Sequence, residues 1–272
     1  PRYLRLVEVV PHLADPEIVS SMTSFLENKL GKGVVNAKDT PNFIANRIGM
    51  YGMMTTLKMT EELGLTVEEV DKLTGTIIGR AKSATFRTAD IVGLDVMIHV
   101  ATNSYEKCTE DEDRDIYKIP GYLQTLVDDG RLGQKTKAGF YKKTDDGIMS
   151  LDFKTLEYTP QKKVRFDGFR LAKDRTLTPS KIKILAESDD KGGKFFWEIL
   201  SRSLIYSANR IPEISDDIVN IDNALKWGFG WEFGPFETWD AIGVSNTLNR
   251  MANEGKKIPT WVEEMVNSGK TS

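Results

Sequence analysis

Glu8 is the residue whose surroundings in the sequence most suggest chemistry. It is an acid in the middle of the apolar run Leu6-Val-Glu-Val-Val10, which has the composition of a short buried strand. A carboxylate in such a strand needs a partner, because its desolvation is otherwise costly. Two interpretations stay open: Glu8 faces a site, or it points outward from an edge strand.

Asn46 is the second candidate. It is polar and lies in the first turns of an apolar helix that the pattern predicts from Thr40-Pro41 to Leu63-Gly64. An amide at this place either faces a cleft between domains or lies on the surface.

The two histidines are weaker candidates for a catalytic role. His12 follows the first strand, and His99 lies among apolar residues of a predicted helix, where we expect a packed structural imidazole. No serine or cysteine nucleophile signature accompanies them, and no metal-type spacing of histidine and cysteine occurs. We therefore predict no metal site.

The elements that must position Glu8 form a βαβ unit. A strand over residues 4–10 is followed by Asp15-Pro16-Glu17, a helix N-terminus, and then by a second strand over residues 33–38. No Gly-x-Gly-x-x-Gly occurs in the chain, so the phosphate-cradling turn of a nucleotide-binding sheet is missing. We interpret this unit as the tail of such a sheet.

A helical pattern occurs twice in the rest of the chain. Val70-Asp71 recurs as Ile221-Asp222, and Phe86-x-Thr-x-Asp-x-Val-Gly93 recurs as Phe236-x-Thr-x-Asp-x-Ile-Gly243. This repetition predicts a duplicated helical domain whose two copies pack on each other. Between the copies, residues 142–194 are charged and broken by prolines, which favours an extended solvated linker over a phosphate-binding patch.

Composition limits the class of protein. The 272 residues carry 37 basic and 40 acidic side chains, so no overall attraction to nucleic acid is expected. No apolar run approaches the ~18 residues of a membrane span. One cysteine and no targeting signal are typical of a reducing compartment, and we expect a cytoplasmic protein.

Four ordered segments resemble the 3-hydroxyacyl-CoA dehydrogenase family. They are Leu6-Val-Glu-Val-Val10, Lys38-Asp-Thr-Pro-Asn-Phe-Ile-Ala-Asn-Arg47, Gly133-Gln-Lys-Thr-Lys-Ala-Gly-Phe-Tyr141 and Gly234-Pro-Phe-Glu-Thr-Trp-Asp240. The second segment departs from the family pattern, because Asn42 replaces a glycine. The tandem copies are similar to the long multifunctional bacterial enzymes, in which an enoyl-CoA hydratase module shares the polypeptide.

The resemblance implies an activity and two site residues. It implies oxidation of (S)-3-hydroxyacyl-CoA to 3-oxoacyl-CoA with NAD in fatty-acid β-oxidation. In the family a His-Phe-Phe-Asn-Pro motif precedes the first strand, and Pro1 falls at or just after it. The catalytic histidine and most of the NAD site are therefore expected outside this fragment, which would be inactive alone. Glu8 matches the glutamate that pairs with this histidine, and Asn46 matches an active-site asparagine.

The expected fold is mainly α, the end of a Rossmann-like α/β domain followed by two helical domains like the C-terminal part of 6-phosphogluconate dehydrogenase. We expect a nucleotide-domain tail over 1–38, helical copies over 39–141 and 194–272, and a linker over 142–193. Two alternatives remain. A dimerisation or scaffold module would place Glu8 and Asn46 in unrelated positions, and a β-hydroxyacid dehydrogenase would lack the Lys38-Asp-Thr-Pro motif.

Overall fold

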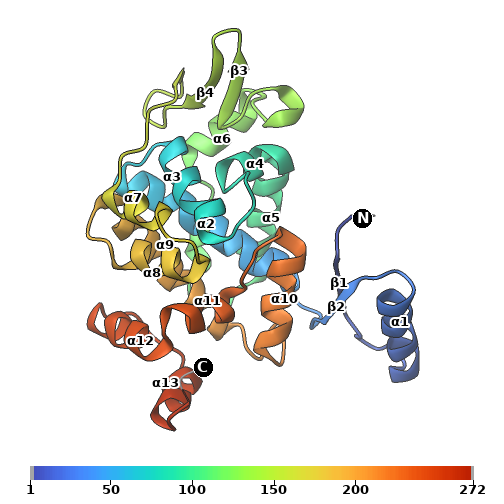
Figure 1. Cartoon of the computed structure of the whole chain (residues 1–272). Helices are drawn as coiled ribbons and strands as arrows, with labels where there is room; N and C mark the ends of the chain where they lie inside the picture. The colour runs from blue at the N-terminus through green and yellow to red at the C-terminus, as the bar shows by residue number, and fades with distance from the viewer. Residues whose placement is uncertain (1–2, 271–272) are drawn as a thin grey trace. The chain divides into compact units, whose positions relative to one another are not determined.

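The computed structural model describes residues 3–270, so Pro1 lies outside the described residues. Helices dominate this part of the chain, as predicted. It divides into two compact units, one formed by residues 3–49 with 200–270 and the other by residues 50–199. Figure 1 labels the elements of both.

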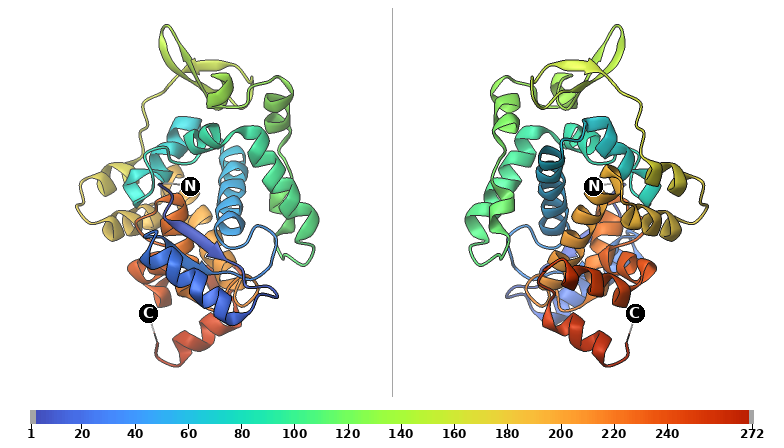
Figure 2. Two further views of the ribbon diagram at one scale, coloured as in Figure 1. Left: turned by 90° about the vertical axis from the view of Figure 1, so that its right-hand side faces the viewer. Right: turned by 90° about the vertical axis from the view of Figure 1, so that its left-hand side faces the viewer.

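The first unit begins with the predicted βαβ arrangement. Strands β1 (Leu6–Val9) and β2 (Gly33–Asn36) pair in parallel, with Leu6 opposite Gly33 and Glu8 opposite Val35. Helix α1 (Pro16–Asn28) connects them and packs against β2, and the left view of Figure 2 shows it in blue next to the strands. The Asp15 side chain accepts a hydrogen bond from the Glu17 N–H at 2.8 Å, which confirms the predicted N-terminus of this helix.

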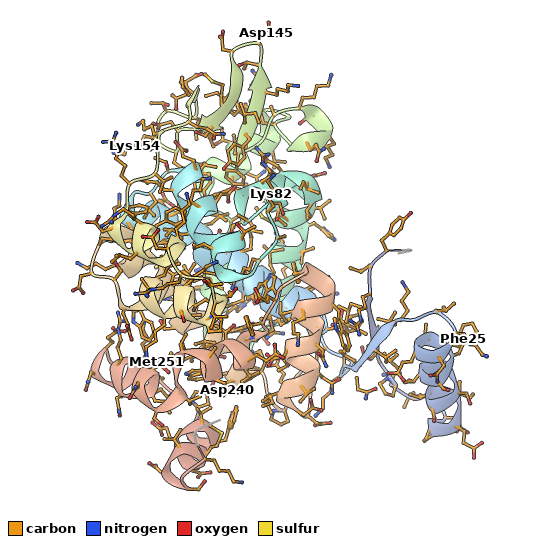
Figure 3. All side chains as sticks on the ribbon, in the orientation of Figure 1. Phe25, Lys82, Asp145, Lys154, Asp240 and Met251 are labelled. Carbon is orange, nitrogen blue, oxygen red and sulfur yellow. The ribbon has the colours of Figure 1, made fainter. Side chains whose placement is uncertain are left out.

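Helix α1 has an apolar face that the described residues do not cover. No residue of the helix is buried, and Ile18, Met22 and Phe25 are 63, 51 and 50% exposed. Figure 3 shows Phe25 on the outer side of the helix. The amphipathic pattern therefore predicted the helix correctly although little packs against it.

Four further helices complete the first unit, together with the last residues of α9. They are α10 (Ile218–Phe229), α11 (Pro235–Ile242), α12 (Val244–Asn253) and α13 (Thr260–Asn267). Helix α10 packs against both β1 and β2, so these strands have a helix from the C-terminal part of the chain as their neighbour.

The second unit is built mostly of helices. They are α2 (Ala45–Leu63), α3 (Val67–Thr74), α4 (Phe86–Val92), α5 (Leu94–Lys107), α6 (Gly121–Asp128), α7 (Asp167–Lys173), α8 (Thr178–Glu187) and α9 (Lys191–Asn209), with short 3₁₀ turns at 76–78, 114–117 and 134–136. Helices α2 and α9 contribute residues to both units. Thr66 and Glu69 form a reciprocal capping box at the start of α3.

The helix that carries Asn46 starts later than the sequence suggests. We predicted its start at Thr40-Pro41, but α2 begins at Ala45. Asn42 and Phe43 have φ angles of 65° and 49°, in the left-handed region. Left-handed residues cannot continue a right-handed helix, so residues 41–44 form a turn instead. Asparagine tolerates this conformation better than most residues, which makes its replacement of glycine compatible with the turn.

Residues 142–193 do not form the extended linker that composition predicted. Strands β3 (Tyr141–Thr144), β4 (Gly147–Leu151) and β5 (Tyr158–Pro160) make an antiparallel sheet, and α7 and α8 follow. Asp145 lies at the tip of the β3–β4 hairpin (Figure 3). The charges that suggested a linker are carried on the solvent side of these elements. The proposed domain limits remain a prediction.

The repeated motif folds the same way in both copies. Asp71 accepts hydrogen bonds from the N–H groups of Phe86 and Arg87, and Asp222 accepts them from those of Phe236 and Glu237. Phe86 and Phe236 are both buried, in equivalent places of the two copies. The turns that end α4 and α11 contain Gly93 and Gly243, with φ angles of 103° and 93°.

The environment of His99 differs from our expectation. Its side chain is exposed on α5, whereas Leu94, Met97 and Ala101 of the same helix are buried. The apolar neighbours of His99 in sequence include Val96, which is also exposed, so proximity to apolar residues did not predict burial here.

Candidate functional site

Glu8 holds the start of α2. Its Oε1 atom accepts hydrogen bonds from the N–H groups of Ile44 and Ala45, at 2.8 and 2.9 Å. These N–H groups belong to the first turn of a helix, where no main-chain acceptor is available within the helix. The half-buried carboxylate of Glu8 therefore acts as a cap supplied from a strand 36 positions earlier in the chain.

These two hydrogen bonds fix the position of the carboxylate but occupy only one of its two oxygens. Both hydrogen bonds end on Oε1, and no partner for Oε2 is found among residues 3–270. A carboxylate oxygen can accept a hydrogen bond from an imidazole N–H and stabilise the imidazolium that forms when the ring takes a proton. The described geometry thus shows Glu8 as a cap of α2 with one further oxygen that could accept a hydrogen bond.

Asn46 lies immediately next to this cap. It follows Ala45, whose N–H is bound to Glu8, and adjacent Cα atoms are about 3.8 Å apart. Its side chain is exposed, so its amide can reach a bound molecule. The structure therefore brings Glu8 next to Asn46 at the first turn of α2.

His12 lies elsewhere in the first unit, in the turn after β1. Its Nδ1 atom is 2.7 Å from Asp39, and both side chains are more than half exposed. They contribute to a surface hollow of about 360 Å³ that Lys38, Asp216 and Asn220 also line. Glu8 is not part of this lining.

Three aspartates of the repeated motif, of which Asp90 and Asp222 are buried and Asp71 is partly buried, have shifted pKa values. Burial raises the pKa of Asp71 and of Asp90 to about 6 and that of Asp222 to about 7, although hydrogen bonds from main-chain N–H groups oppose the shift. Asp90 binds the N–H groups of Phe140 and Tyr141. Apart from the Tyr141 hydroxyl, which donates to Asp71 at 2.8 Å, these partners are main-chain N–H groups, which indicates that the aspartates hold the fold.

Comparison with known proteins decides the family. Residues 43–143 match the profile described as 3-hydroxyacyl-CoA dehydrogenase, C-terminal domain. A probable 3-hydroxyacyl-CoA dehydrogenase of Bacillus subtilis is 48% identical over 98% of this chain. The chain belongs to the 3-hydroxyacyl-CoA dehydrogenase family. It spans 34% of the length of this relative, and 42% of a Deinococcus radiodurans relative of the same name that is 50% identical over 54% of this chain.

A solved structure shows the same fold. The crystal structure of 3-hydroxybutyryl-CoA dehydrogenase from Escherichia coli K12 matches with a TM-score of 0.66 and 18% identity. The match covers 98% of this chain and 68% of that one. At this identity the likeness concerns the fold alone.

Neither a dinucleotide motif nor a metal cluster is found in this part of the chain. The glycine-rich turn that binds a pyrophosphate is absent from the sequence. Among residues 3–270, no group of three or more histidine, cysteine, aspartate or glutamate side chains could hold a metal ion. No helix in that range is long and apolar enough to cross a membrane.

Arg47 is a residue of this region whose importance the sequence did not indicate. It follows Asn46, and its side chain is only 1% exposed. Its Nε atom donates to the Tyr206 hydroxyl at 2.6 Å, and its Nη2 atom lies 3.1 Å from Glu213. The only signal in the sequence was the family segment that ends at Arg47, because both partners lie about 160 positions later.

Proposed function

We propose that this chain is the substrate-side portion of an NAD-dependent 3-hydroxyacyl-CoA dehydrogenase that oxidises (S)-3-hydroxyacyl-CoA to 3-oxoacyl-CoA. NAD supplies the hydride acceptor when it is bound, from a site mostly outside this chain. A histidine that this chain does not contain takes the hydroxyl proton. Glu8 orients that imidazole and stabilises its charged form, and Asn46 lies near the substrate carbonyl or the imidazole.

The observation that carries this proposal is the position of Glu8. Two main-chain N–H groups fix its carboxylate at the start of α2, directly beside Asn46. A scaffold or dimerisation module, our alternative, gives no reason for these two polar residues to lie together. The proximity of Glu8 and Asn46 therefore favours a dehydrogenase over a scaffold module.

The names of some relatives support a place in fatty-acid oxidation. A Rickettsia prowazekii protein named putative fatty acid oxidation complex trifunctional enzyme is 28% identical over 92% of this chain, which spans 34% of its length. We propose that this chain likewise shares a polypeptide with an enoyl-CoA hydratase module, works in fatty-acid β-oxidation, and acts in the cytoplasm.

The test is Glu8→Gln in the full-length enzyme. Glutamine keeps an oxygen that can accept the two N–H groups, so α2 remains capped while the negative charge is lost. We expect kcat to fall by about 10²-fold or more, because the imidazolium loses its counter-charge. Glu27→Gln, on the exposed side of α1, is the control. An unchanged kcat for Glu8→Gln would show that Glu8 serves only as a cap.

A further inference from the structure

The strand that carries Glu8 is supported by α10. The indole of Trp227 lies so close to Gly33 of β2 that a β-carbon on this glycine would be 2.3 Å from the ring. Gly228 faces β1 in the same way, since a β-carbon there would be 2.9 Å from the Leu6 side chain. Glycine at both positions lets α10 approach the two strands closely.

Main-chain N–H groups at the end of β2 donate hydrogen bonds that add to the contact with α10. The Asn36 N–H donates to Oδ1 of Asn220 at 3.0 Å, and the Lys38 N–H donates to the carbonyl of Ile214 at 3.0 Å. The end of β2 is therefore bound to α10 and to the loop that precedes it. Val35 of β2 is the register partner of Glu8. This attachment therefore also fixes the position of the carboxylate along the strand direction.

The helix that carries Asn46 is held by the same part of the chain. Arg47 is buried, and its guanidinium contacts Tyr206 and Glu213. Arg210 lies 2.8 Å from the second oxygen of Glu213, so the acid is fixed between two arginines. A buried arginine with several directed contacts has little freedom to move, and neither does the first turn of α2.

We infer that residues 206–229, in the second helical copy, position Glu8 and Asn46 for catalysis, with Trp227 and Tyr206 as positioning residues. This inference rests on the proposed function. Catalytic groups must be held to within about 0.5 Å, and a displacement of about 1 Å can cost 10²-fold in rate. Trp227 acts through the strand that bears Glu8, and Tyr206 acts through the arginine that follows Asn46.

The first experiment is Trp227→Leu in the full-length enzyme. A leucine leaves the strand pair without the ring that lies against Gly33, and we expect kcat to fall about tenfold with little change in KM. Trp239→Leu is the matched control, because its indole belongs to the same unit but donates to Thr247 on α12. The control should lower the melting temperature and leave the kcat of the folded enzyme within about twofold.

The second experiment separates positioning from general destabilisation. In an enzyme that already carries Glu8→Gln, Trp227→Leu should lower kcat by less than twofold, because it acts through a carboxylate that is no longer there. A full additional tenfold loss in that background would overturn the inference.

Tyr206→Phe provides a second variant in case Trp227→Leu fails to fold. It removes only the hydroxyl that accepts from Arg47 and keeps the ring, and we expect kcat to fall severalfold with KM nearly unchanged. Tyr158→Phe, which removes a hydroxyl bound to the Gly139 carbonyl, is its control.

The outcomes distinguish the two proposals. If Glu8→Gln leaves kcat unchanged, the proposed function fails at its central residue. If Glu8→Gln lowers kcat but neither Trp227→Leu nor Tyr206→Phe differs from its control, residues 206–229 do not position the site and only the inference is overturned.

Discussion

At the scale of single residues, Glu8 has one observed role, as a cap, and we propose a second, as the partner of a histidine. One oxygen caps α2, and the other can accept a hydrogen bond from a histidine. The cap explains how an acid is tolerated in an apolar strand, because hydrogen bonds to helix N–H groups offset the cost of desolvation.

The capping role predicts a loss of stability that charge removal alone does not cause. Glu8→Ala leaves the N–H groups of Ile44 and Ala45 without their acceptor, and we expect a loss of about 1–3 kcal/mol in the free energy of unfolding. Glu8→Gln should lose less than half of that. Urea denaturation of both variants measures the difference, and equal stabilities would contradict the capping role.

Prediction from the sequence succeeded where the signal was local. Asp15 and Pro16 predicted the start of α1, because this cap is formed within a few positions of the chain. Glu8 and Asn46 were found as polar residues in apolar elements. The partners of Glu8 could not be predicted, since a bond across 36 positions depends on how the strand and the helix meet.

Arg47 and residues 142–193 show two other limits. An arginine in an apolar helix suggests a surface position, and only the distant partners Tyr206 and Glu213 make its burial possible. The β3–β4 hairpin has exposed lysines at 142 and 143, so its charged composition resembles that of a linker. Small sheets with one solvated face give little hydrophobic signal.

At the scale of elements, the loop before α11 is fastened to α10 by one carboxylate. Asp222 accepts hydrogen bonds from the N–H groups of Phe236 and Glu237, and Asp71 does the same for α4 in the other copy. In both copies this aspartate therefore binds the start of one helix to an earlier helix.

Asp222 should make stability depend on pH. Burial raises its pKa in the folded protein to about 7, against 3.8 for an exposed aspartate; the nearby Glu237 carboxylate raises it further and the Lys226 ammonium lowers it. The folded state thus binds the proton more tightly, so the contribution is fully present below pH 3.8 and is lost as pH rises through 7. We expect Asp222→Asn to flatten the fall in unfolding free energy between pH 4 and 7.

Chemical denaturation at intervals across this pH range measures the slope. Asp189→Asn changes an exposed aspartate and should leave the slope unchanged. An Asp222→Asn protein with the same slope as the parent would show that another group is responsible.

At the scale of the whole chain, the proposed function places the NAD site mostly outside these residues. We expect the isolated chain neither to bind NADH with useful affinity nor to oxidise 3-hydroxyacyl-CoA, because it has no glycine-rich turn for the pyrophosphate. Fluorescence titration with NADH tests this. Micromolar binding, or turnover of acetoacetyl-CoA by the isolated chain, would mean that the cofactor site has been misplaced.

The same organisation predicts that the isolated chain is not equally stable throughout. Helix α1 contacts β2 but buries none of its side chains, whereas α10 has buried residues and packs against both strands. Local opening of a helix costs little free energy when few apolar contacts are lost. We expect the amides of α1 to exchange with deuterium well before those of α10. Exchange measured by mass spectrometry resolves the two helices, and equal protection would show that contacts along β2 suffice to hold α1 in place.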